Sequence, residues 1–209
     1  MRKTQAIIIA LLIIFSGMNA KSAVANESST SAICISLYER NYLERIAFAA
    51  FSELTCGHYQ RALVITNRPK TEAPELSEKR IKKIRNFLHD SETVDLFIFG
   101  HTNSASIWFR NKLESDFSGK LRMVYNSGCT DGQEVDGREW LKSARVFVGH
   151  PGDNFGGKFT PSFTRNWFRG KPLSEAVQLA NRKLDKSKYF ESKNDPLAYL
   201  YGDGALVFP

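Results

Sequence analysis

Two residues with catalytic potential each follow a short apolar segment of the chain. Segment 94–99 leads through a glycine into His101, and segment 121–125 leads through Asn-Ser-Gly into Cys129. A cysteine thiolate is a nucleophile, and it forms readily when a neighbouring imidazolium or a helix N-terminus lowers the thiol pKa. If the two segments are neighbouring strands, His101 and Cys129 make a catalytic pair. The alternative is a hydrogen-bonded loop histidine and a small buried cysteine.

Further candidate site residues lie in the turns that follow the same apolar segments. The glycines at 128 and 132 let the chain turn sharply and aim backbone N–H groups at a developing oxyanion. His150 follows segment 146–148 and is a candidate for lining a substrate cleft. Asp131 and Asp153 are candidates for binding a basic substrate side chain, although loop aspartates are usually turn formers.

Three cysteines are an odd number for a protein of an oxidising compartment, so one thiol is left over if two of them pair. Cys34 and Cys56 flank one helical stretch and are the expected disulfide, which would stabilise the fold by roughly 3 kcal/mol. The alternative is that both are buried free thiols. Cys129 lies far from them in a glycine-rich turn and is the thiol left over.

The elements that position these residues follow from hydrophobic periodicity and turn signals. Helices are expected over 37–54, after Pro74, over 138–144, around Phe159 to Trp167 and over 172–184. Strands are expected over 61–66, 94–99, 121–125 and 146–148, with a final edge strand over 205–208. Alternating strands and helices predict an α/β fold, a three-layer α/β/α sandwich with a mainly parallel sheet. Ligands of such sheets bind beyond the carboxyl ends of the strands, where His101 and Cys129 are expected.

An apolar strand ending in histidine, followed by one ending in Gly-Cys, resembles the caspase-like fold of clan CD cysteine peptidases. The segments WLKSARVFVG (140–149) and GKPLSEAV (170–177) are similar to the region after the catalytic cysteine in CHAT-domain members. Within the clan, the chain most resembles the CHAT-domain and gingipain-like members. The resemblance covers roughly residues 61–187. It implies Cys129 as the nucleophile and His101 as the general acid or base. The N–H of Cys129, in the turn begun by Gly128, and the backbone beside His101 are implied for the oxyanion hole.

One departure from that family pattern concerns the residue after the histidine. Glycine is usual there, whereas this chain has Gly100 before the histidine and Thr102 after it. A threonine could crowd the oxyanion site, so two main hypotheses stay open: an active cysteine endopeptidase that acts on peptides or proteins, or an inactive caspase-like binding or envelope-interaction module. A third hypothesis is another cysteine-dependent acyl transfer, which uses the same dyad and differs only in the acceptor. The turn at 130–132 is not a caspase pentapeptide, so no caspase specificity carries over.

The first 25 residues have the order of a secretory signal peptide. Arg2 and Lys3 precede the apolar run 6–15, and small residues stand at 23–25. Cleavage there predicts a chain that starts near Asn26, with Lys21 as the alternative start. A mobile leader is expected over 26–32 and a single domain over 33–209. The protein is therefore expected to be exported, either periplasmic or secreted, and the apolar run is too short for a stable membrane span.

Charge and motif content exclude several classes of function. Removal of the signal peptide lowers the net charge from +7 to +4. This surplus could assist contact with anionic envelope surfaces, but it is too small and dispersed to indicate nucleic acid. The basic residues of the helix after Pro74 are most simply its solvated face. The pair Cys56 and His58 lacks a second pair of ligands for a metal. No phosphate loop or dinucleotide fingerprint is present, so no cofactor is expected, and the oligomeric state stays open.

Overall fold

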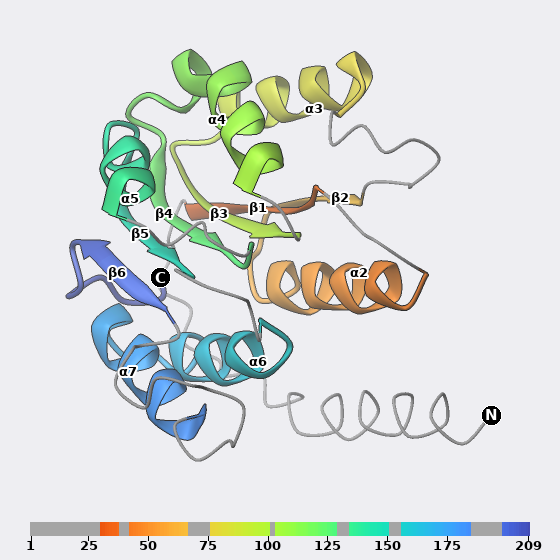
Figure 1. Cartoon of the computed structure of the whole chain (residues 1–209). Helices are drawn as coiled ribbons and strands as arrows, with labels where there is room; N and C mark the ends of the chain where they lie inside the picture. Colours follow the sequence, from red (N-terminus) through yellow and green to blue (C-terminus); the bar gives the residue numbers. More distant parts are fainter. Residues whose placement is uncertain are drawn as a thin grey trace.

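The computed structural model describes residues 30–37, 42–66, 76–100, 103–128, 134–150, 156–184 and 198–209. These residues form six strands and six helices (Figure 1). The strands are β1 (Thr30–Ser36), β2 (Ala62–Thr66), β3 (Thr93–Phe99), β4 (Leu121–Asn126), β5 (Ala144–Gly149) and β6 (Tyr199–Gly202). The helices are α2 (Tyr42–Cys56), α3 (Glu78–His89), α4 (Asn103–Phe117), α5 (Glu134–Leu141), α6 (Gly156–Trp167) and α7 (Leu173–Leu184).

The strands form one sheet in the order β2-β1-β3-β4-β5-β6. All neighbouring pairs are parallel except β5 and β6, which are antiparallel. Helices α3, α4 and α5 cover one face of the sheet, and α2, α6 and α7 cover the other (Figure 1). The predicted three-layer α/β/α fold with a mainly parallel sheet is therefore confirmed.

Both faces of the sheet are buried, which explains why its strands are almost continuously apolar. Successive side chains alternate between the faces: Leu96 and Ile98 of β3 pack with α3, α4 and α5, while Phe97 and Phe99 pack with α2, α6 and α7. The fully buried aromatic side chains lie in these two layers. This packing holds the carboxyl ends of the central strands in fixed positions.

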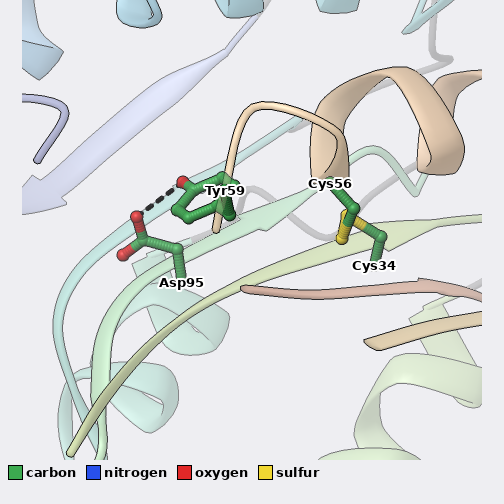
Figure 2. Close-up of a disulfide and its surroundings, with 4 residues drawn as sticks. All are labelled: Cys34, Cys56, Tyr59 and Asp95. Carbon is green, nitrogen blue, oxygen red and sulfur yellow. Dashed lines mark hydrogen bonds between the residues drawn. A yellow bond between two sulfur atoms is a disulfide. The ribbon is translucent and has the colours of Figure 1, made fainter. Parts of the chain in front are cut away.

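A disulfide joins β1, the strand next to the edge strand β2, to the layer of α2. Cys34 lies in β1 and Cys56 is the last residue of α2, as the close-up in Figure 2 shows. This is the pair expected from the sequence. Both side chains are almost fully buried.

A buried ionic group lies on the same face of the sheet. The Tyr59 hydroxyl donates to Asp95 Oδ2 at 2.7 Å (Figure 2), and Arg122 Nε donates to Asp95 Oδ1 at 2.8 Å. A second Arg122 nitrogen contacts Asp95 Oδ2, and Nη1 donates to the carbonyl of Val207 at 3.1 Å. The group of Tyr59, Asp95 and Arg122 thus links β3, β4, the segment after α2 and the C-terminal segment.

Three predictions of local structure need correction. Residues 30–32, expected in a mobile leader, belong to β1, which lies between β2 and β3 inside the sheet. The final strand is Tyr199–Gly202 rather than 205–208, because Gly202 adopts a positive φ of 95° and ends the pairing with β5. Helix α5 spans Glu134–Leu141 rather than 138–144, since residues from Ala144 onward already pair with β4.

Candidate functional site

The two strands that precede the predicted catalytic residues are neighbours. Strands β3 and β4 pair in parallel, with Ile98 opposite Asn126 near their carboxyl ends. The chain leaves the two ends through Gly100 and Gly128, both buried. The adjacency on which the sequence prediction depended is therefore present.

Hydrogen bonds hold these two strand ends together. The Ser127 N–H donates to the carbonyl of Ile98 at 2.9 Å, and the Gly100 N–H donates to Ser127 Oγ at 3.4 Å. The Gly128 N–H donates to Asn126 Oδ1 at 2.9 Å, which closes a turn directly after β4. Asn126 and Ser127 are 1% and 2% exposed. Two buried polar side chains therefore fix the directions in which both chain segments leave the sheet.

Most of the predicted site residues fall outside the described part of the chain. These are His101, Thr102, Cys129, Asp131, Gly132 and Asp153. Their predicted roles in catalysis, the oxyanion hole and substrate binding stay predictions. Of the predicted oxyanion and turn residues, the structure describes Gly100 and Gly128 at the adjoining strand ends.

No known family model matches the chain, and no curated protein matches it. The site must therefore be argued from its own geometry.

The next strand end carries His150, directly after β5. Its ring is 2% exposed and contacts Phe159 edge-on. Nε2 of His150 lies 3.3 Å from the Tyr125 hydroxyl, which also lies 2.6 Å from the Thr160 hydroxyl. The structure thus places His150 in a buried polar group under the carboxyl edge, and its predicted contact with substrate stays a prediction.

Sequence reasoning missed Tyr125 and Thr160 as members of this group. Burial raises the pKa of Tyr125, so its hydroxyl keeps its proton at neutral pH. The group can position the His150 ring from β4 and α6 at once. In the sequence, Tyr125 looks like an ordinary core aromatic residue of an apolar strand. Its ring does have that role, since it stacks on Phe163.

Helices α4 and α5 follow the two strand ends of the candidate site. Helix α4 begins at Asn103, four residues after β3 ends, and its first turn contains no acidic residue. Helix α5 begins at Glu134, and Glu134 and Asp136 in its first turn offset the positive potential there. The α4 N-terminus therefore offers the stronger electrostatic aid to an anion such as a thiolate or an oxyanion.

Searches for a metal cluster and for a membrane span are negative in the part of the chain that the structure describes. No group of three or more histidine, cysteine, aspartate or glutamate side chains there could hold a metal ion. No helix among these residues has the length and apolar character needed to cross a bilayer.

Proposed function

We propose that this protein is an exported cysteine endopeptidase in which Cys129 and His101 act as a dyad. The observation that carries the proposal is the hydrogen-bonded adjacency of the β3 and β4 carboxyl ends. His101 follows Gly100, and Cys129 follows Gly128. Each of the two is bonded directly to a glycine at one of the adjoining strand ends, and consecutive Cα atoms are only about 3.8 Å apart. This short tether supports the proposal.

The fold class is compatible with this proposal. A six-stranded, mostly parallel sheet with helices on both faces is compatible with the caspase-like fold that the sequence resembles. Fold alone does not imply function, so the proposal depends on the site. Export is supported by the Cys34–Cys56 disulfide, since disulfides persist in oxidising compartments.

The chemistry expected of the dyad is acyl transfer to a thiolate. The Cys129 sulfur attacks the peptide carbonyl carbon, a C–S bond forms, and the carbonyl electron pair moves to oxygen. Collapse of this intermediate breaks the C–N bond while His101 gives its proton to the leaving amine. Water, deprotonated by His101, then attacks the thioester carbon. The C–S bond breaks, the acyl group leaves as a carboxylic acid, and His101 returns the proton to the sulfur.

The decisive experiment is the rate of alkylation by iodoacetamide as a function of pH. The alkylated cysteine is identified by mass spectrometry in the wild type, in His101→Ala and in a control variant, His89→Ala. Cys34 and Cys56 are paired, so Cys129 is the only remaining thiol. We expect fast labelling of Cys129 that persists below pH 7 and slows at least tenfold in His101→Ala, because the imidazolium no longer lowers the thiol pKa.

The control tests whether the loss is specific, since His89 is exposed at the end of α3, before β3 begins, and Gly100 follows the other end of that strand. His89→Ala should label like the wild type. Slow labelling in all three proteins, or Cys129 found in a disulfide, would overturn the dyad. The departure at Thr102 would then favour the inactive binding module.

A further inference from the structure

Helix α3 carries the net positive charge of the mature protein. Its five basic residues and one acidic residue give it a charge of +4. Of the 29 basic residues in the chain, α3 holds five and the predicted signal peptide three, and of the 22 acidic residues α3 holds one. The rest of the chain is therefore balanced, with 21 of each sign. The charge surplus that looked dispersed in the sequence is localised in twelve residues.

Three lysines of this helix form one exposed stripe. At 3.6 residues per turn, Lys79, Lys82 and Lys83 lie opposite the buried residues Ile81, Ile84 and Leu88. All three lysines are exposed, and α3 lies beside α4 at one end of its layer (Figure 1). We call Lys79, Lys82 and Lys83 the lysine stripe.

The stripe has no acidic counterpart among the described residues around it. The Glu78 carboxylate lies 3.1 Å from Lys112 Nζ, and Asp116 Oδ2 accepts from Arg85 Nε at 3.0 Å. None of the three stripe lysines forms an ion pair with a described residue. Their spacing at three and four residues brings like charges together, which costs helix stability. An external anion would relieve this repulsion.

We propose that the lysine stripe docks the protein on the surface of an anionic phospholipid bilayer. Lysine ammonium groups are compact charges on flexible stems, and they suit a plane of phosphate headgroups better than one shaped pocket. The stripe contains no aromatic side chain, whereas single-stranded nucleic acid is bound by stacking on aromatic rings. Export would bring the stripe to envelope membranes. The contact is peripheral and is independent of the proposed peptidase activity.

The test is co-sedimentation of the purified, processed protein with vesicles. One set of vesicles contains equal amounts of phosphatidylglycerol and phosphatidylcholine, and the other contains phosphatidylcholine alone. The wild type is compared with Lys79→Gln/Lys82→Gln/Lys83→Gln at low salt, because glutamine keeps the helix propensity and removes the charge. Each lysine near an anionic surface contributes about fivefold to binding, so we expect the triple variant to bind about 100-fold more weakly.

A matched control removes the same charge elsewhere. Arg138, Lys142 and Lys171 are exposed and form ion pairs within their own helices or turns, so Arg138→Gln/Lys142→Gln/Lys171→Gln also loses three positive charges. This control should bind within about threefold of the wild type if each charge acts only near the surface. The variant Lys79→Arg/Lys82→Arg/Lys83→Arg should also keep binding, which separates charge from folding defects.

Three outcomes would overturn the proposal. They are equal binding to neutral and anionic vesicles, equal loss in the two glutamine variants, and absence of vesicle binding by a protein that binds a DNA oligonucleotide. Binding that follows the lysine stripe and weakens as salt screens the charges would support it. Iodoacetamide labelling of Cys129 should be unchanged in the stripe variant, so failure of docking and failure of the dyad are distinguishable.

Discussion

Asn126 has an unusual position for a buried polar residue, at the point where a central strand ends. Its side-chain oxygen accepts the N–H of Gly128 two residues later, which is the local bond that makes asparagine common in turns. Ser127 acts in the same turn by accepting the N–H of Gly100 from the neighbouring strand end. These two side chains, rather than the backbone ladder alone, define the edge of the candidate site.

At this scale we predict that Asn126→Ala destabilises the protein. Alanine leaves the buried Gly128 N–H without its acceptor, which should lower the free energy of unfolding by about 1–3 kcal/mol. Urea denaturation measures the change. Asn86→Ala is the control, because Asn86 is exposed on α3 and its loss should stay within about 0.5 kcal/mol. Equal effects of the two substitutions would show that the turn does not depend on this bond.

At the scale of elements, periodic apolar patterns were sufficient for most of the fold. The helix containing Ile81, Ile84 and Leu88 and the β3 and β4 strands follow directly from spacing and from continuous apolar runs. Helix α4 was missed although Phe109, Leu113 and Phe117 recur every four residues on its buried side. Its exposed surface also carries apolar residues, which weakens the contrast between its two sides.

Strand β1 was not predicted because local sequence and tertiary position disagree. Its first residues, Thr30 and Ser31, are small and polar, which is typical of a leader. Ser31 is nevertheless buried, and Thr30 bonds across the sheet to Thr93 at 3.1 Å.

For the candidate site, the two strand ends could be predicted from sequence. The bonds of Ser127 to Ile98 and Gly100 could not, since they depend on the register between β3 and β4.

The disulfide between β1 and α2 gives a prediction at this scale. It closes a loop of 22 residues, and its loss should lower the free energy of unfolding by about 3 kcal/mol, because the unfolded chain gains conformational entropy. The double variant Cys34→Ala/Cys56→Ala is compared with the wild type by urea denaturation. Wild-type protein unfolded with dithiothreitol serves as the control and should show a loss of similar size. Equal stability of the variant and the oxidised wild type would contradict the prediction.

At the scale of the whole molecule, the Asp95–Arg122 pair joins parts that are far apart in the sequence. Arg122 reaches the carbonyl of Val207, and Tyr59 packs against Phe208 while its hydroxyl bonds to Asp95. A buried ion pair is tolerated only when its remaining hydrogen-bonding groups are satisfied, and Tyr59 supplies one such bond. Protonated Tyr59 is therefore part of what holds the C-terminal segment on the sheet.

This arrangement predicts how the stability of the molecule depends on alkaline pH. Burial, with the nearby Asp95 charge, raises the pKa of Tyr59 well above 10.0, and burial raises that of Tyr125 as well. Above pH 10 the unfolded chain loses protons that the folded chain keeps, so stability falls as pH rises. Each tyrosine should contribute a slope of about 1.4 kcal/mol per pH unit, and this contribution is absent below pH 10.

Urea denaturation between pH 8 and pH 11.5 measures this slope, and absorbance of tyrosinate at 295 nm shows whether the two hydroxyls ionise only on unfolding. Tyr59→Phe and Tyr125→Phe should each flatten the slope by about 1.4 kcal/mol per pH unit, whatever their effect on stability at pH 8. Tyr199→Phe is the control, because Tyr199 is only half-buried in the edge strand β6. If all three variants kept the wild-type slope, the alkaline loss of stability would have to come from other groups, and the protonated Tyr59 hydroxyl would not be what secures the C-terminal segment.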